Sequence, residues 1–477
     1  MKSVDVIVIG GGILGCFAAR NLMRWKLSVL LLEEKEDLCR GITRANSAIV
    51  YSGYDNKAGS LKAQMAVRAN AGFDALCREL DVPFVRCGSL AVSFGPEADR
   101  TLQKKYENGL KNKVPGIRLL TGEEARAMEP QLSSEVTSAL YAPTTGTVNP
   151  WQLGIAAFEN AAENGCKSRR NTKVTGIRKN GQGYVVTCEI AEGSAQEQLM
   201  ADSGNRYRKK QRTEIVCRAV LNCAGLSSDR IQELLFPTSV RIVQDASCYL
   251  VMDRGMQAPG RIIFQELETG KGITAVPSAG GNLILESVKY EQKGAQFAVD
   301  VHELKRLKEM SAEVLPGLDC SQVIRSFGAV RPNPQEKDGR NIGSFVIEHP
   351  APGFYSLIGI KTPGITCAEE LGMYLAERTA CYLEAVENPD FSPVRKGIPS
   401  LHQMSFEQRV EFVKEHPDYG EIICRCEDIS RGEVLEAIRR GAVTVDGVKR
   451  RAGTGMGRCQ GSRCSRIIGK LLEENIL

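Results

Sequence analysis

Blocks of apolar residues alternate with glycine-rich and polar stretches at the start of the chain. The apolar run VDVIVI spans residues 4–9, and the turn GGG follows it directly. A helical stretch comes next, and a second apolar run, SVLLLEE, occupies residues 28–34. Because strand, tight turn, helix and second strand in this order form a βαβ unit, the pattern predicts a parallel sheet with helices packed on it.

Later stretches show other patterns. RCGSLAVSF at residues 86–94 and GNLILESVKY at residues 281–290 alternate apolar and polar positions as strands do, which favours a second sheet. From residue 387 to residue 419 the chain turns polar and carries four prolines. This part is therefore expected to connect the main body to a compact C-terminal piece.

Composition narrows the class of protein. The chain has 477 residues, 42% of them hydrophobic and 25% charged, which suits a globular protein of two or three domains. The net charge of +5 gives no reason to expect nucleic acid as a partner. No apolar run approaches the roughly 20 residues of a membrane span, and Asp5 interrupts the apolar start, so neither a transmembrane segment nor a signal peptide is expected.

These features predict a cytoplasmic protein that contacts a membrane, if at all, peripherally through a partner. In a reducing compartment the sixteen cysteines are expected to be free thiols or metal ligands rather than disulfides.

The glycine turn matches the motif G-x-G-x-x-G at Gly10, Gly12 and Gly15. Gly10 allows a sharp turn, Gly12 lets the backbone approach a pyrophosphate, and Gly15 lets the helix pack on the strand. The helix that follows points its free N–H groups toward the phosphates. Glu33, at the end of the second apolar run, is placed to accept hydrogen bonds from a ribose. Together these features predict a dinucleotide site; a glycine turn without a ligand is the alternative.

Four cysteines form two closely spaced pairs near the C-terminus. Cys424 and Cys426 make C-x-C, and after thirty-two residues Cys459 and Cys464 make C-x-x-x-x-C. Four thiolates suit either zinc or an iron–sulfur cluster, so the count alone leaves both open.

Residues 41–63, GITRANSAIVYSGYDNKAGSLKA, resemble the segment that lies along the flavin in the D-amino-acid oxidase-like flavoprotein superfamily. The nearest branch is the glycerol-3-phosphate dehydrogenase and L-2-hydroxyglutarate dehydrogenase group. The resemblance implies an FAD enzyme of the α/β class with a Rossmann-like FAD-binding domain. The positions that fit the pattern of that branch are Thr43, Asn46, Ser47 and Gly53.

Further matches cover most of residues 1–385. Val174 falls where the superfamily makes a backbone contact to adenine, and Ala224 and Gly225 fall where a late strand ends beside the phosphates. GIKTPGITCAEELG at residues 359–372 resembles the loop and helix that close over the flavin ring. In that loop the flavin-binding residues implied by the resemblance are Gly364, Ile365 and Thr366.

The C-terminal cysteine pairs resemble the bacterioferritin-associated-ferredoxin-like domain, which carries a 2Fe–2S cluster. The match includes the helical stretches GEVLEAIRRG and CSRIIGKLLEEN. It implies that Cys424, Cys426, Cys459 and Cys464 ligate a 2Fe–2S cluster, with zinc as the alternative.

The two resemblances imply a domain plan. An antiparallel-sheet substrate domain is inserted into the FAD-binding domain of the superfamily, and a small helical iron–sulfur domain follows here. The expected boundaries are 1–75, 146–235 and 331–386 for the FAD-binding domain, 76–145 and 236–330 for the substrate domain, 387–417 for the linker, and 418–477 for the 2Fe–2S-binding domain.

Two cationic residues match positions that bind anionic substrates in the relatives. Arg331, in FGAVRPNPQEKDG, matches a substrate-binding arginine, and a guanidinium offers a bidentate fork to phosphate or carboxylate. A structural ion pair is its alternative role. Lys361 matches the lysine of a G-G-K motif in glycerol-3-phosphate dehydrogenases, although the residues after it, TPGIT, depart from the motif.

Tyr51 stands where the relatives carry histidine, and none of the four histidines lies in this motif. Alcohol oxidation needs a group that takes the hydroxyl proton while hydride leaves for the flavin. Tyrosine, with an ordinary pKa of about 10, serves poorly unless neighbours such as Lys62 or Arg331 lower its pKa. Otherwise another group takes the proton, or the substrate is an amine that needs no such base.

The resemblance thus implies a dehydrogenase that oxidises a small anionic secondary alcohol, in the first place glycerol 3-phosphate. A flavin accepts two electrons together and can release them singly, whereas a 2Fe–2S cluster carries one. We therefore expect electrons to leave through the cluster to a second flavoprotein or another acceptor subunit. The alternatives are oxidation of L-2-hydroxyglutarate or another 2-hydroxy acid, oxidation of an amine or imino acid as in opine-type dehydrogenases, and a non-catalytic electron-transfer subunit.

Overall fold

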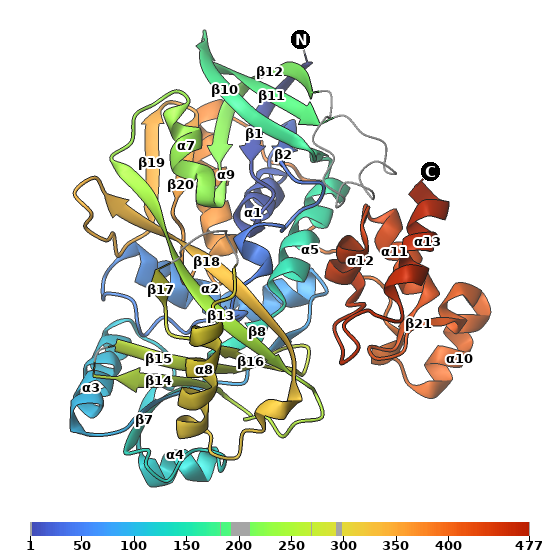
Figure 1. Cartoon of the computed structure of the whole chain (residues 1–477). Helices are drawn as coiled ribbons and strands as arrows, with labels where there is room; N and C mark the ends of the chain where they lie inside the picture. Colours follow the sequence, from blue (N-terminus) through green and yellow to red (C-terminus); the bar gives the residue numbers. More distant parts are fainter. Residues whose placement is uncertain (1, 182, 192–209, 269, 292–297, 477) are drawn as a thin grey trace.

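The first layer is a sheet built around the N-terminal strand. The structure is a computed structural model that describes residues 2–181, 183–191, 210–268, 270–291 and 298–476. Within these residues, eight strands form the sheet, and its centre is parallel (Figure 1). The parallel strands are β9 (Lys167–Arg169), β2 (Val29–Leu32), β1 (Lys2–Ile9), β12 (Lys210–Asn222) and β20 (Phe354–Ile358). Antiparallel strands complete it: β10 (Thr172–Asn180), β11 (Gly183–Ala191) and β19 (Val346–Ala351).

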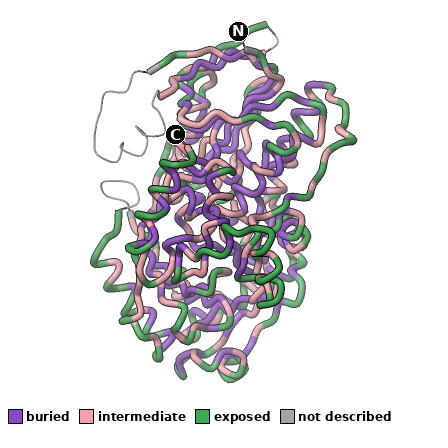
Figure 2. The backbone as a smooth tube through the Cα atoms, turned by 90° about the vertical axis from the view of Figure 1, so that its right-hand side faces the viewer, coloured by how far each residue is buried: buried purple, intermediate pink, exposed green. Residues whose placement is uncertain are grey.

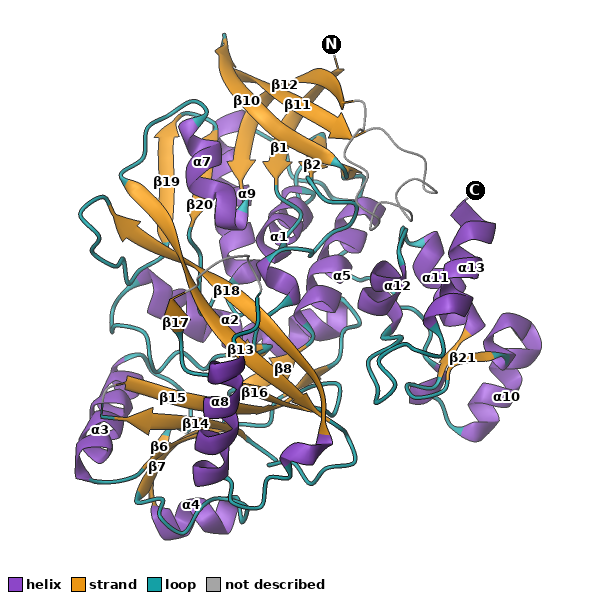
Figure 3. Ribbon diagram, in the orientation of Figure 1, coloured by secondary structure: helices purple, strands orange, loops and turns teal. Residues whose placement is uncertain are grey.

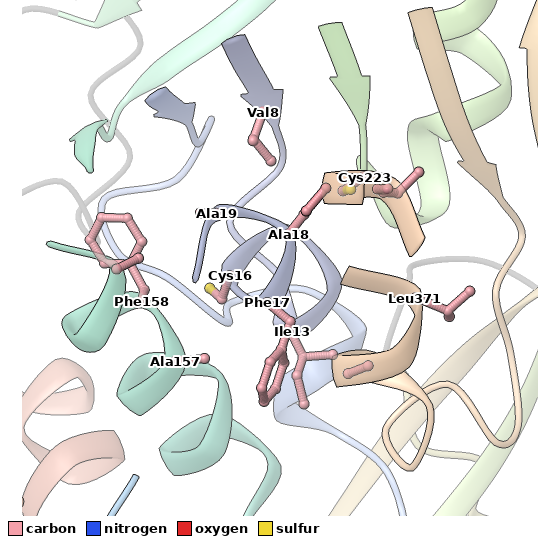
Figure 4. Close-up of a cluster of buried hydrophobic side chains, with 14 of the residues drawn as sticks. Val8, Ile13, Cys16, Phe17, Ala18, Ala19, Ala157, Phe158, Cys223 and Leu371 are labelled. Carbon is pink, nitrogen blue, oxygen red and sulfur yellow. The ribbon is translucent and has the colours of Figure 1, made fainter. Parts of the chain in front are cut away.

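Three helices bury apolar faces against this sheet and one another: α1 (Ile13–Leu22), α5 (Pro150–Glu163) and α9 (Ala368–Leu383). Small residues let their backbones come close; a Cβ at Gly372 of α9 would lie 2.7 Å from the Phe17 carbonyl carbon of α1. Figure 4 shows Phe17 and Leu371 in the resulting core. Fully burying a side chain of this size stabilises the fold by about 1.5–3 kcal/mol.

The second sheet has nine strands in the described residues and is antiparallel except where β14 meets β5 (Figure 3). Its strands are β5 (Ser89–Ser93), β6 (Arg118–Thr121), β7 (Ser138–Ala142), β13 (Val240–Met252), β14 (Ile262–Leu267), β15 (Gly270–Pro277), β16 (Leu283–Glu286), β17 (Tyr290–Glu291) and β18 (Val323–Glu336). The expected boundary after residue 330 falls inside β18, because β18 pairs with β13 along its whole length as far as Glu336.

Shorter elements complete the main body. A three-stranded sheet contains β3 (Ile49–Val50), β4 (Phe84–Val85) and β8 (Gly146–Val148), and α2 (Leu61–Glu79) runs between its strands in the sequence. The other α-helices described are α3 (Pro96–Lys111), α4 (Gly122–Met128), α7 (Ser228–Glu233) and α8 (Val301–Val314). Buried residues run through the middle of the main body, and exposed residues lie mostly along its edges (Figure 2).

The C-terminal residues fold around an apolar core of their own. The elements are α10 (Phe406–Glu415), β21 (Ile422–Cys424), β22 (Ile429–Ser430), α11 (Arg431–Arg439), α12 (Val445–Ala452) and α13 (Ser465–Ile476). A capping box between Ser430 and Glu433 starts α11, so its first N–H groups are satisfied. Between α9 and α10 the described chain contains no helix or strand other than the short 3-10 turn Leu401–Gln403.

Buried ion pairs dock the C-terminal domain against the main body. Asp37, which follows β2 and is fully buried, accepts two hydrogen bonds of 2.8 Å from Arg451 and one of 2.6 Å from Arg450, both on α12. Against the effect of burial, Arg451 and Arg450 hold the pKa of the Asp37 carboxyl well below its usual range. Removing one partner of such a pair costs about 3–5 kcal/mol because it leaves a buried charge unpaired, so Asp37 and the arginines of α12 depend on each other in the docked position.

Among the described residues, no helix is both long enough and apolar enough to span a bilayer.

Candidate functional site

The glycine turn between β1 and α1 is shaped by close backbone contacts. A Cβ at Gly15 would lie 1.9 Å from the Gly10 carbonyl oxygen, and one at Gly10, whose φ is +102°, would lie 2.6 Å from the Cys223 carbonyl oxygen. Both positions therefore require glycine for packing. A Cβ at Gly12 would meet only Thr43 Oγ1, at 3.5 Å. The space in front of Gly12 is thus left open by the described protein atoms, which suits a pyrophosphate.

Glu33 lies at the carboxyl end of β2, beside this open space. Its Oε2 accepts the Gly11 N–H at 2.6 Å and its Oε1 accepts the Lys35 N–H at 2.8 Å. Burial raises the pKa of the Glu33 carboxyl, and the two backbone N–H groups oppose that rise. Each oxygen keeps a second lone pair, so the carboxylate is still able to accept ribose hydroxyls. These residues fit a dinucleotide.

Within residues 41–53, the side chains predicted to bind the cofactor also hold this segment in place. Thr43 Oγ1 accepts the Ile13 N–H of α1 at 3.1 Å, and Ser47 hydrogen-bonds the Tyr51 side chain. Asn46 donates to the Ile42 and Thr43 carbonyl oxygens and accepts the Ala48 N–H at 2.8 Å, so its amide is used to fix the turn. Gly53, with φ +100°, packs on α2, where a Cβ would lie 2.8 Å from Val67 Cγ2.

The other predicted cofactor residues surround the same end of the first sheet. Val174 is buried on β10, and Ala224 and Gly225 follow β12, whose end lies beside the end of β1. In the loop before α9, the Gly364 N–H donates to the Lys361 carbonyl oxygen at 2.7 Å. Thr366 is buried, and its Oγ1 accepts the Tyr51 N–H at 2.9 Å, which ties this loop to the 41–53 segment. Ile365, also in the loop, packs against the core around α1.

Tyr51 does not have the lowered pKa that would make it a base. Burial raises the pKa of its phenol, and the Glu286 carboxylate raises it further, which outweighs the opposing effects of Lys271 and Arg331. The ring stacks near Phe264, with centroids 6.1 Å apart. The hypothesis that neighbouring cations lower its pKa is therefore wrong, because the nearby carboxylate and the apolar surroundings dominate. A phenol with a raised pKa keeps its proton at neutral pH.

Arg331 projects from β18 and already has a protein partner. It forms an ion pair with Glu286 of β16, and the Tyr249 hydroxyl donates to the same carboxylate at 2.9 Å. Against the effect of burial, Glu286 raises the pKa of the Arg331 guanidinium. The structural ion pair expected as the alternative role thus exists, and it uses one side of a guanidinium that has five N–H donors. The remaining donors suit an anion.

Further cations gather near Arg331 and Tyr51. We call Lys62, Lys271, Lys289, Arg331 and Lys361 the cationic cluster, because each is close enough to at least one other member to affect its pKa. Burial lowers the pKa of Lys62 to about 8, and Lys361 adds repulsion. Burial also lowers the pKa of Lys289 to about 8, with Arg331 and then Lys271 contributing.

The cationic cluster contains more positive charge than its carboxylates balance. Lys271 pairs with Asp55 and Arg331 with Glu286. No carboxylate of the described residues lies within ion-pair distance of Lys62, Lys289 or Lys361, although Asp245 is near enough to Lys289 and Lys361 to raise the pKa of both. Lys361 donates to the Asn333 amide oxygen. Closely placed cations with lowered pKa values fit a site that binds an anion.

Sequence reasoning missed Lys289 and Glu286 and gave Lys62 only a secondary role. One signal was available for Lys62: it stands in the first turn of α2, after the N-cap Ser60, where the helix dipole disfavours a cation. Glu286 and Lys289 belong to the stretch already identified as strand-like, but only the tertiary structure shows that β16 lies beside Tyr51 and Arg331.

The four C-terminal cysteines approach one another in two pairs. Cys426 lies beside Cys459 and Cys424 beside Cys464, each pair close enough for one thiol to affect the pKa of the other. Cys424 and Cys464 are buried, whereas Cys426 is exposed and Cys459 half-buried. Burial raises the pKa of the Cys464 thiol to about 12, while the Gly461 N–H lowers the pKa of Cys459. The Gly455 N–H also points at Cys424 Sγ, at 3.5 Å, so backbone donors surround the sulfurs.

This arrangement fits a two-iron cluster better than one metal ion. In the part of the chain that the structure describes, no three His, Cys, Asp or Glu side chains are grouped as a single ion would need. A 2Fe–2S cluster takes two protein ligands on each iron, so two cysteine pairs match it. A Cβ at Gly457 would lie 2.6 Å from Cys426 Cβ, which shows how closely the loop wraps this pair.

Comparison with known proteins identifies both parts of the chain. The sequence pattern of the family "FAD dependent oxidoreductase" matches residues 5–378, and that of the "BFD-like [2Fe-2S] binding domain" matches residues 422–474. A glycerol 3-phosphate dehydrogenase from Caloramator mitchellensis is 35% identical over 98% of this chain and 94% of its own. The mitochondrial L-2-hydroxyglutarate dehydrogenase of Homo sapiens is 27% identical over 73% of this chain and 81% of its own.

A solved structure shares the fold of the main body. The L-α-glycerophosphate oxidase from Mycoplasma pneumoniae, with FAD bound, superposes with a TM-score of 0.72 at 22% identity. The superposition covers 84% of this chain and all of that one. The expected fold class, an α/β FAD-binding domain with an inserted sheet domain and a small helical iron–sulfur domain, is confirmed.

Proposed function

Because the chain belongs to the FAD dependent oxidoreductase family and carries a BFD-like [2Fe-2S] binding domain, we propose that it oxidises glycerol 3-phosphate and delivers the electrons to a protein acceptor. The chain is an FAD-dependent oxidoreductase whose cofactors are FAD and a 2Fe–2S cluster, as predicted. The proposal adds the substrate, the order of electron transfer and the residues that act.

The cationic cluster favours a dianionic substrate. Lys62, Lys289 and Lys361 form no ion pair with a carboxylate of the described residues, and a phosphate of charge near −2 would offset most of their charge. The dicarboxylate L-2-hydroxyglutarate carries a similar charge, so the choice of glycerol 3-phosphate is supported by the curated relative with 35% identity, which is a glycerol 3-phosphate dehydrogenase.

In the proposal, each residue has a defined task. Arg331 and Lys361 bind the phosphate, and the ion pair with Glu286 fixes the guanidinium in one orientation. Tyr51 keeps its proton and donates a hydrogen bond to the substrate, so the hydroxyl proton that is released as hydride leaves passes to solvent. The glycine turn, Thr43 and Glu33 would hold FAD, which supplies the hydride acceptor when bound. Cys424, Cys426, Cys459 and Cys464 would hold the cluster, which takes electrons singly.

Substrates can be compared directly by reduction of the bound flavin. The protein is purified without air, and glycerol 3-phosphate, glycerol, L-2-hydroxyglutarate and a panel of amino and imino acids are added separately while the visible spectrum is recorded. The proposal expects bleaching of the flavin band by glycerol 3-phosphate and none by uncharged glycerol at equal concentration. Bleaching by L-2-hydroxyglutarate alone would show that L-2-hydroxyglutarate, and not glycerol 3-phosphate, is the substrate. The human relative makes it the second candidate. Bleaching by none of these compounds, with dithionite still reducing both centres, would contradict the proposal.

Replacing Tyr51 by phenylalanine tests the role of its phenol. A hydrogen bond contributes about 0.5–1.5 kcal/mol, so kcat/KM should fall by no more than about tenfold. Loss of a general base would instead cost about 10²–10⁴-fold. Steady-state kinetics with glycerol 3-phosphate between pH 6 and pH 10 distinguish the two, because only loss of a base also removes a limb of the pH profile.

The lowered lysine pKa values predict how substrate affinity depends on pH. Burial lowers the pKa of Lys62 to about 8, so Lys62 loses its charge as the pH rises through 8, whereas Lys289 is exposed to solvent and should contribute less to the pH dependence. The phosphate stays a dianion over this range, since its second pKa is about 6. KM for glycerol 3-phosphate should therefore be lowest below pH 8 and rise above it, by about tenfold per pH unit for each lysine that must be protonated. A Lys62→Arg variant, which keeps the charge, should reduce the rise; an unchanged KM from pH 7 to pH 10 would contradict the assignment.

A further inference from the structure

The cysteines of the cluster-binding loops differ in exposure. Cys424 and Cys464 are buried in the apolar core of the C-terminal domain itself. Cys426 is exposed and Cys459 half-buried, so this pair forms the edge nearest to solvent, although Glu427 and Arg458 beside it pair with Arg254 and Asp253 of the main body. Figure 1 shows the C-terminal domain packed against the side of the main body, with α10 and α13 on its far side.

Three exposed arginines lie close in the sequence to the cysteines of this solvent-exposed edge. Arg425 precedes Cys426 directly, and the Arg463 N–H points at the Cys459 sulfur. Arg466 follows in the first turn of α13, and all three side chains belong to exposed residues. Ile467 beside them is 43% exposed and adds an apolar contact. We call Arg425, Arg463, Arg466 and Ile467 the outer basic surface.

The arginines of the outer basic surface are unpaired within the described chain. The nearest carboxylates by sequence are engaged elsewhere: Glu427 pairs with Arg254 at 2.6 Å, and Asp428 pairs with Arg409 at 3.2 Å. Other exposed arginines do have carboxylate partners, as Arg68 has with Glu370 and Arg439 with Glu436. These three arginines thus place positive charge without an ion-pair partner in the described residues beside the two cysteines nearest to solvent.

We propose that the outer basic surface is the docking site for an acidic protein that accepts single electrons from the cluster through the Cys426–Cys459 edge. This inference rests on the proposed assignment of the four cysteines as cluster ligands. Charge complementarity favours an acidic protein over a neutral small acceptor, because long-range attraction raises association rates by about 10–10³-fold and orients the partner on encounter. The step is a one-electron transfer: the reduced cluster returns to its oxidised state and the acceptor is reduced by one electron.

Charge reversal tests the docking site with acceptors of opposite charge. The triple variant Arg425→Glu, Arg463→Glu, Arg466→Glu is compared with a control of equal charge change, Lys104→Glu, Lys111→Glu, Lys113→Glu, whose exposed lysines lie on or just after α3. Glutamate near the start of α13 suits the helix dipole, so the first variant is expected to fold. The probes are plastocyanin, which is acidic, and cytochrome c, which is basic; both accept one electron.

Binding and electron transfer are measured separately on the full-length holoprotein. The affinity of oxidised plastocyanin for the oxidised holoprotein is measured at low and high salt without turnover. Reduction rates of both acceptors are then measured after photochemical reduction of the protein, so that the result does not depend on the identity of the substrate. The cluster absorption of each variant is recorded first, so loss of the cluster cannot be mistaken for loss of docking.

The proposal expects the arginine variant to bind and reduce plastocyanin at least about tenfold more weakly at low salt, with cytochrome c reduced faster. The difference from the control should shrink at high salt. Equal behaviour of the two triple variants toward plastocyanin would overturn the proposal, as would faster reduction of cytochrome c than of plastocyanin by the unmodified protein at low salt. If the glutamate variant loses the cluster, the corresponding Gln variant gives the same comparison with a smaller expected loss.

Discussion

A Cys459→Ser variant should lose the 2Fe–2S cluster and, with it, transfer of electrons to one-electron protein acceptors. The expected loss of acceptor reduction exceeds the roughly 10–100-fold effects seen when only the groups around metal ligands are altered, because a ligand itself is removed. Glycerol 3-phosphate should still bleach the flavin, since the cysteines belong to a domain with its own core, separate from the residues around Tyr51. The visible spectrum, iron content and rate of acceptor reduction measure these outcomes.

Cys459 suits this experiment better than the two buried cysteines. It is half-buried, so serine leaves no large cavity, whereas Cys464 is only 1% exposed within the domain core. The matched control is Cys381→Ser on α9, an exposed cysteine remote in sequence from the cysteine pairs, which should change neither cofactor. An intact cluster spectrum in the Cys459 variant would show that the ligand assignment is wrong; loss of the cluster in the Cys381 variant would show that the assay reports general damage.

The sequence predicts the glycine turn of the dinucleotide site from local rules. Gly10 and Gly15 are required by backbone contacts between neighbouring elements, and a Cβ 1.9 Å from the Gly10 carbonyl oxygen explains why Gly15 cannot be replaced. Such contacts depend on a strand, a turn and a helix that follow one another in the chain. Family membership and both cofactors, predicted from motif order, are confirmed by the comparisons.

The sequence predicted the substrate region less well because that region is assembled from distant segments. Arg331 and Glu286 are 45 residues apart and meet only because β18 and β16 both pair with β13. Burial raises the pKa of Tyr51, and the carboxylate that the same juxtaposition puts near it raises that pKa further. Lys289 belongs to a stretch whose alternating pattern predicts a strand but gives no information about what the strand faces.

A Lys361→Met variant should weaken binding of glycerol 3-phosphate strongly while leaving the fold intact. A charge-assisted hydrogen bond contributes about 1.5–3 kcal/mol, which corresponds to a rise in KM of about 10–150-fold. Lys361 donates to the Asn333 amide oxygen and has no carboxylate partner in the described residues, so methionine leaves no buried charge uncompensated. Steady-state kinetics measure the rise, and thermal unfolding should show a melting temperature within a few degrees of the unmodified protein.

Arg331 offers the informative contrast, because its removal has two effects. An Arg331→Ala variant should lose substrate affinity and also leave Glu286, whose side chain is 5% exposed, without its counter-charge, at a cost of about 3–5 kcal/mol of stability. Adding Glu286→Gln should recover most of the stability and none of the affinity for the anion, because the guanidinium fork is still missing. If the double variant also recovered substrate affinity, Arg331 would act only as a structural ion pair, and the phosphate would be held by the lysines.

If Lys361→Met left KM unchanged, the cationic cluster would not be the phosphate site, and the substrate assignment would fall with it.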